Sequence, residues 1–116
     1  IRERFERIGT VVEVPERLMT VAGACSGVGP AYIALLAEAW IDAAVRRGMP
    51  AAMATTLITE TLAGTAELLR HNGGDTLGLR RAVASPGGTT ARGLAALERG
   101  GVRAALGSAM DEVVGS

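Results

Sequence analysis

Residues 30–47, PAYIALLAEAWIDAAVRR, are the part of this sequence that most constrains the fold. Three polar side chains, Glu38, Asp42 and Arg46, recur every four residues, so an α-helix here would be polar along one narrow stripe and apolar elsewhere. Pro30 suits the first position of that helix because it has no N–H group to leave unpaired there. A helix with so little polar surface lies at the centre of a bundle or is covered by a partner subunit.

Apolar periodicity and helix-ending residues predict four further helices, which makes about five in all. Gly48 and Pro50 separate the first long helix from the second, and Gly100 and Gly101 separate the last two. The four further predicted helices are residues 51–69, residues 76–84 with Asp75 as N-cap, residues 89–99, and residues 102–113. We therefore expect a mainly α, helical bundle that forms an intertwined homodimer, because five helices with one almost wholly apolar member exceed what a small monomer can cover.

The first residues are predicted to differ from this bundle. IRERFERIG, residues 1–9, has the pattern of the charged end of a helix that Gly9 would stop, and TVVEVPE, residues 10–16, is typical of a short strand at best. One strand cannot satisfy its own ladder, so we expect its partner on another chain or in a part that this sequence does not include. The first residue is Ile1 and not Met, which also suggests a piece of a longer protein.

Composition excludes several classes of function. The charges of twelve basic and twelve acidic residues cancel. The sequence also has no basic stripe interleaved with aromatic residues, so nucleic-acid binding is not expected. The longest apolar segment, residues 30–45, is interrupted by two acidic residues and is too short to span a bilayer, so no membrane partner is expected. One cysteine and one histidine do not make a metal site, and a lone Cys25 fits a reducing, cytoplasmic location.

SPGGTTARGL, residues 85–94, is the strongest candidate for a binding site. Pro86 ends one helix, Gly87 and Gly88 let the backbone turn freely, and Thr89 and Thr90 begin the next helix. A helix start presents unpaired N–H groups and a positive dipole end, which suit a carboxylate or phosphate. The alternative is an ordinary capped junction, in which a hydroxyl of Ser85 or Thr89 satisfies the backbone donors and no ligand binds.

A second glycine-rich loop, GACSGVGPAY over residues 23–32, is predicted to be a tight packing turn. It does not have the G-x-G-x-x-G spacing, and only one short strand precedes it, so a dinucleotide fingerprint is not favoured. Cys25 is interpreted as a buried, inert thiol because His71, the only histidine, is far along the chain.

Three segments together resemble the C-terminal domain of pyrroline-5-carboxylate reductases over residues 13–114: CSGVGPAYIALLAEAWIDAAVRRGMP, TLAGTAELL and LRRAVASPGGTTARGLAALERGGVRAAL. The resemblance implies that residues 1–14 are the tail of a dinucleotide-binding, Rossmann-like domain and residues 15–116 a helical dimerisation and substrate-binding domain. It further implies an NAD(P)H-dependent oxidoreductase of proline biosynthesis that converts 1-pyrroline-5-carboxylate to L-proline. NADPH or NADH would be bound mainly by the N-terminal domain, so these residues alone would be inactive. Members of the family form homodimers, often assembled into decamers.

The resemblance also assigns roles by position. The substrate carboxylate would be held by Ser85, Gly87, Gly88, Thr89 and Thr90. Thr90 would also bond the ring nitrogen as the catalytic hydroxyl, and Val83 would approach the nicotinamide. Two alternatives stay open: an oligomerisation module without a catalytic role, and a reductase of another cyclic imine acid, because Val28 stands where the family usually has serine.

Overall fold

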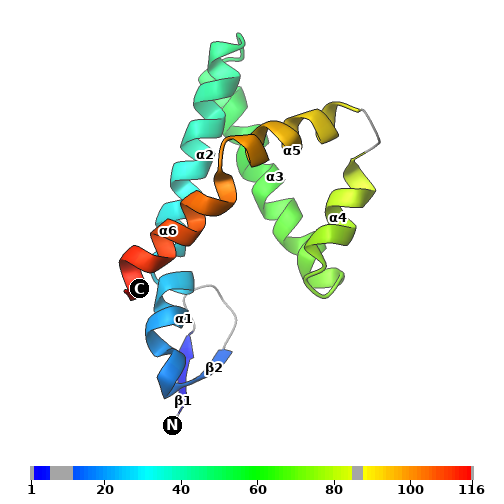
Figure 1. Ribbon diagram of the computed structural model, residues 1–116. Coiled ribbons are helices and arrows are strands. Elements are labelled where there is room, and N and C mark those ends of the chain that lie inside the picture. The colour runs from blue at the N-terminus through cyan, green and yellow to red at the C-terminus, as the bar shows by residue number, and fades with distance from the viewer. Residues whose placement is uncertain (1, 6–11, 85–87, 116) are drawn as a thin grey trace. The chain divides into compact units, whose positions relative to one another are not determined.

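The computed structural model describes residues 2–5, 12–84 and 88–115, and these are mainly helical (Figure 1). The elements are β1 (Arg2–Phe5), β2 (Val12–Pro15), the 3₁₀ helix η1 (Glu16–Leu18), α1 (Met19–Ser26), α2 (Gly29–Arg46), α3 (Ala51–His71), α4 (Thr76–Val83), α5 (Thr89–Arg99) and α6 (Val102–Val114). The mainly α class is confirmed. Each of the five predicted helices, now α2 to α6, begins and ends within two residues of its expected bounds.

The prediction for the first residues was wrong in two ways. Arg2–Phe5 is a strand and not the end of a helix, and it pairs antiparallel with Val12–Pro15 of the same chain, with Arg2 opposite Pro15. A helix this short is marginal in water, whereas a neighbouring strand satisfies the backbone N–H and C=O groups. The expected partner strand on another chain is therefore not needed for β2, and the predicted stop at Gly9 lies outside the described residues.

The glycine-rich segment at residues 23–29 was predicted as a loop but is largely helical. Helix α1 continues to Ser26, so the described residues hold six α-helices and not five, and the loop shrinks to a turn at Gly27 and Val28. Both N–H groups of the turn donate to the Gly23 carbonyl, at 2.8 and 3.3 Å. A Cβ atom at Gly27 would lie 2.8 Å from that oxygen, so glycine is needed there. The predicted tight packing turn is confirmed, but it is shorter than expected and consists of Gly27 and Val28.

The chain divides into two compact units, one of residues 1–36 with 103–116 and one of residues 37–102. In the first unit, α1 lies against β2 and η1, with Val14 and Ala24 buried. In the second, α3 contacts α4, and Ala54 and Ile58 are buried one turn apart on α3. These four are the buried apolar side chains in the part of the chain whose burial the structure describes. Each unit therefore has a very small core of its own.

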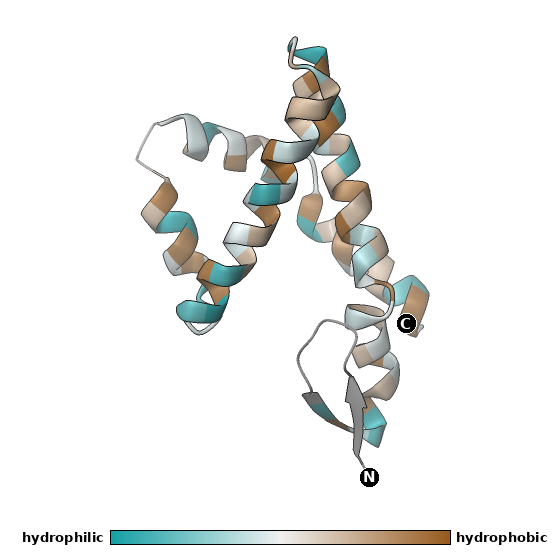
Figure 2. Ribbon diagram, turned by 180° about the vertical axis from the view of Figure 1, so that it is seen from behind, coloured by the Kyte–Doolittle hydropathy of each residue, from teal (hydrophilic) through white to brown (hydrophobic). Residues whose placement is uncertain are grey.

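Large apolar side chains are exposed along α2 and α3, where hydrophobic residues recur along both ribbons (Figure 2). Half or more of the surface of each of these residues is exposed: Ile33, Leu35, Leu36, Trp40, Met53, Leu57 and Leu68. Burial of apolar surface is the main favourable term in folding and association. A complex in which a second molecule covers these helices would therefore be strongly stabilised.

One helical stretch among the described residues, Glu16–Arg46, is long and apolar enough to cross a membrane by length and composition alone. Residues 30–45 alone were predicted to be too short to span a bilayer, but α1 adds apolar length before them. The turn at Gly27 and Val28 interrupts this stretch. Helices at the centre of a bundle or beneath a partner subunit have the same composition.

The connection between α3 and α4 is stabilised by hydrogen bonds from its own side chains. The Asp75 carboxylate accepts a hydrogen bond from the Gly78 N–H at 2.8 Å, which confirms Asp75 as the N-cap of α4. The Asn72 side chain bonds both the N–H and the C=O of Asp75, at 2.9 and 3.0 Å. Gly73 and Gly74 have φ values of +72° and +81°, which only glycine adopts without strain.

We expect Asp75→Ala to lower the free energy of unfolding by about 1 kcal/mol, because the Gly78 N–H would lose its only side-chain acceptor among the described residues. Urea unfolding at a fixed protein concentration measures this change. Asp111→Ala is the matched control, since Asp111 lies near the C-terminal end of α6, where a negative charge is not favoured by the helix dipole. Equal effects of the two substitutions would contradict a capping role.

Candidate functional site

The predicted site lies between the end of α4 and the start of α5, both within residues 37–102. Val83 is the last residue of α4, its side chain is 63% exposed, and Ala84 after it is extended. Gly88 is the N-cap of α5 and is also extended, with φ of −80° and ψ of 176°. Ser85 and Gly87, two of the predicted site residues, lie outside the described residues.

The start of α5 has the properties of an anion site. The Gly88 carbonyl accepts the first helical hydrogen bond, from the Arg92 N–H at 3.1 Å, and Gly88 has no side chain to cap the helix. For the N–H groups of Thr89, Thr90 and Ala91, no acceptor is found in the part of the chain that the structure describes. These donors and the positive end of the helix dipole are oriented to receive a negatively charged oxygen.

The two threonines of this helix start differ in environment. Thr89 is exposed, whereas Thr90 is half-buried, as is Leu94 one turn later on the same face. The Thr89 hydroxyl accepts a hydrogen bond from Arg92 Nη2 at 3.5 Å and does not cap a backbone N–H among the described residues. The alternative in which Thr89 caps the helix is therefore not observed, and the alternative through Ser85 falls outside the described residues.

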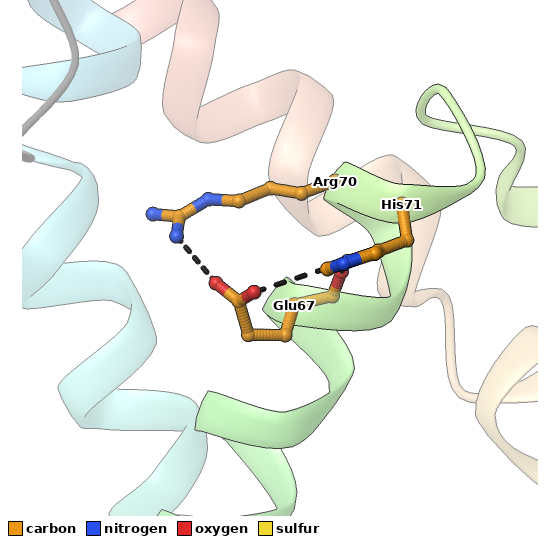
Figure 3. Close-up of polar contacts among 3 residues, drawn as sticks. All are labelled: Glu67, Arg70 and His71. Atoms are coloured by element: carbon orange, nitrogen blue, oxygen red, sulfur yellow. Dashed lines mark hydrogen bonds and ion pairs between the residues drawn. The ribbon is translucent and has the colours of Figure 1, made fainter.

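A polar cluster at the end of α3 does not belong to this site (Figure 3). The Glu67 carboxylate pairs with Arg70, and His71 Nδ1 lies 3.0 Å from the Glu67 carbonyl oxygen and 3.9 Å from its carboxylate. All three side chains are more than half exposed. Exposed pairs of this kind contribute only a few tenths of a kcal/mol, so the cluster is a solvated helix end.

Cys25 was predicted to be buried, but the structure exposes it. It lines an apolar cavity of about 240 Å³ together with Ser26, Gly29, Pro30 and Ile33. The prediction was wrong because Cys25 lies in the last turn of α1, beside this open space and not within a core. None of the lining residues is a base, so the lining offers no group that would activate the thiol.

The described residues do not fit a complete cofactor or metal site. The strand pair β1 and β2 is antiparallel, and the glycine turn at residues 27–28 joins two helices, whereas a dinucleotide fold places its glycine turn between a strand and a helix. Val83 is an exposed apolar residue at the end of α4, and its contact with a nicotinamide ring stays a prediction. No group of three or more His, Cys, Asp or Glu residues that could hold a metal is present in residues 2–5, 12–84 and 88–115.

A family model described as pyrroline-5-carboxylate reductase dimerisation matches residues 16–115. This chain belongs to that family. Curated relatives are the pyrroline-5-carboxylate reductase of Synechocystis, 46% identical over 102 residues, and that of Thermus thermophilus, 46% identical over 110 residues. The matches cover 88% and 95% of this chain but 38% and 41% of the two relatives. The chain thus spans about 40% of their length.

Solved structures support the same family. The 1-pyrroline-5-carboxylate reductase of Streptococcus pyogenes is similar with a TM-score of 0.85 at 36% identity, over 89% of this chain and 40% of that one. The Plasmodium falciparum pyrroline carboxylate reductase, solved with NADP bound, is similar with a TM-score of 0.83 at 33% identity, over 87% of this chain and 38% of that one. The helical fold is therefore that of the pyrroline-5-carboxylate reductase dimerisation domain.

Proposed function

We propose that this chain is the dimerising and substrate-binding part of a cytoplasmic pyrroline-5-carboxylate reductase, which reduces 1-pyrroline-5-carboxylate to L-proline with NADPH or NADH. The observation that carries the proposal is the start of α5, where Gly88, the last residue of the SPGG sequence, is the N-cap and the next N–H groups have no acceptor among the described residues. Family membership supports it, since the relatives that match most of this chain are named as these reductases.

The proposed site recognises the substrate mainly by charge. The carboxylate of the substrate is an anion at neutral pH, and it would accept hydrogen bonds from the N–H groups of Gly88, Thr89 and Thr90 at the positive end of α5. Gly88 has no Cβ atom, so the anion can approach the backbone closely. Ser85 and Gly87 complete this loop in the proposal.

The proposed role of this chain in the reaction is to position the substrate relative to the cofactor. A nicotinamide cofactor, when bound, supplies the hydride, and Val83 would offer it an apolar surface. The Thr90 hydroxyl would donate to or accept from the ring nitrogen of the substrate and so fix the imine relative to its carboxylate. Half-burial of Thr90 supports this role, because a hydrogen bond shielded from water is stronger and better oriented.

The second part of the proposal is a homodimer. The apolar residues exposed along α2 and α3 would be covered by a second copy of the chain, as the description of the family model suggests. Assembly of dimers into decamers belongs to the same proposal. A module that only oligomerises would need these helices but not the start of α5, so ligand binding distinguishes the two functions.

Titration of the chain with L-proline tests the proposal, followed by NMR at the amides of Gly88, Thr89 and Thr90 after sedimentation has established the oligomeric state. We expect saturable shifts confined to the start of α5, because the carboxylate would bond these N–H groups. L-Prolinamide, which lacks the carboxylate, is the matched control and should cause no such shifts. A folded dimer that does not respond to L-proline would favour the oligomerisation module.

Thr90→Val should remove the proposed hydrogen bond to the ring nitrogen while keeping the shape of the side chain. The assay uses a chimaera in which this chain replaces the matched region of the Synechocystis reductase. We expect kcat/KM to fall by about tenfold to a hundredfold, the cost of one lost hydrogen bond at a shielded site, with the dimer unchanged. Thr20→Val is the control, because Thr20 is an exposed threonine in α1, outside both the proposed site and the apolar helices α2 and α3. Unchanged kinetics for Thr90→Val would remove Thr90 from the site.

Trp40→Glu should break the proposed dimer, since Trp40 is 50% exposed on α2 and a buried, unpaired carboxylate is costly. Sedimentation velocity over a concentration series should show the dissociation constant raised by about thirtyfold or more. Glu38→Gln changes an exposed side chain of the same helix and should leave the dimer intact. A Trp40→Glu chain that dimerises as tightly as the parent would place the interface elsewhere.

A further inference from the structure

The segment around the proposed carboxylate site is strongly basic. Arg80 and Arg81 occupy the last turn of α4, and Arg92 lies one turn into α5. All three side chains are exposed, and residues 76–97 contain no aspartate or glutamate. A positive potential at this junction attracts anionic ligands and is weakened by salt.

Arg92 differs from the other two arginines because it contacts the site itself. Its Nη2 donates to Thr89 Oγ1 at 3.5 Å, at the long end of the range for a hydrogen bond. A hydroxyl has one hydrogen to donate and two lone pairs to accept with. When the guanidinium donates to the oxygen, one acceptor position is used and the hydroxyl hydrogen is directed away from Arg92, where it remains available to an anion.

We propose that Arg92 is a positioning residue for the substrate carboxylate: it holds the Thr89 hydroxyl as a donor toward the anion and adds a positive charge behind it. The inference rests on the proposed function and deepens it, because it explains how an exposed threonine at the helix start takes part in binding. Arg92 itself does not contact the substrate. Its effect is exerted through Thr89 and through its charge one turn from the bound anion.

Arg99 provides a matched control on the same helix. It is the last residue of α5, it is exposed, and it lies about 10 Å farther along the axis than Arg92. Arg99→Gln changes the net charge as Arg92→Gln does, but it leaves Thr89 untouched. A difference between the two variants therefore reports on position and not on total charge.

The test is the L-proline titration of the chain, with binding measured from the Thr89 and Thr90 amides. Arg92→Gln should raise the dissociation constant about threefold to tenfold, as expected for one partly screened charge near the anion, and the effect should shrink at high salt. Arg92→Lys should restore part of the affinity, and Arg99→Gln should match the parent chain. In a Thr89→Ala background, Arg92→Gln should have a smaller effect, because its partner is absent.

Each outcome decides the inference. If the parent chain binds L-proline and Arg92→Gln binds equally well, the role of Arg92 is overturned while the proposed function stands. An equal loss in Arg99→Gln, or a full effect of Arg92→Gln without Thr89, would also overturn it. A folded parent chain that binds no L-proline would overturn the proposed function and this inference together.

Discussion

The scarcity of apolar burial within the chain is the constraint on which the rest of the structure depends. Among the side chains whose burial is described, Val14, Ala24, Ala54 and Ile58 are the buried apolar ones, while α2 and α3 expose many larger ones. Hydrophobic burial has to offset the conformational entropy that folding removes. The fold therefore depends on a cover for α2 and α3, and a second copy of the chain has the apolar helices that such a cover requires.

The scarcity of apolar burial also affects the candidate site. Neither α4 nor α5 has a buried residue, and α4 is held by its contact with α3 and by the Asn72 and Asp75 hydrogen bonds. Both helices are short for independent stability in water. A site at their junction is thus well positioned only when α3 is itself fixed by the interface. If the start of α5 binds the substrate as proposed, dimerisation and substrate binding are linked, although the hydrogen-bonding groups proposed for the site come from one segment of the chain.

The sequence predicted the elements that local chemistry determines. Glycine and proline mark the ends of α2 to α6, so these helices were predicted within two residues. Strand β1 was missed because strand pairing depends on a partner outside the local window. The continuation of α1 to Ser26 was missed because helical hydrogen bonds outweighed the low propensity of its glycine. The exposure of Cys25 depends on how α1 and α2 meet, which no local pattern reveals. A candidate site could be proposed from the sequence because its residues are consecutive, and their role stays a prediction. The contact of Thr89 with Arg92 was not predicted, although residues three apart on a helix are neighbours on its surface.

Recognition by a helix start also bears on substrate choice. Backbone N–H groups and a dipole end respond to a negatively charged oxygen and not to the ring that carries it, so this part of the site would accept any cyclic imine acid of suitable size. Discrimination would then come from side chains that contact the ring, and the proposal assigns this role to Thr90, which is half-buried in the first turn of α5. Val28 lies at the turn between α1 and α2, whose backbone bonds to Gly23 are made whatever its side chain. The unusual valine is therefore compatible with an intact turn, and the question of which imine acid binds is a question about the surroundings of Thr90.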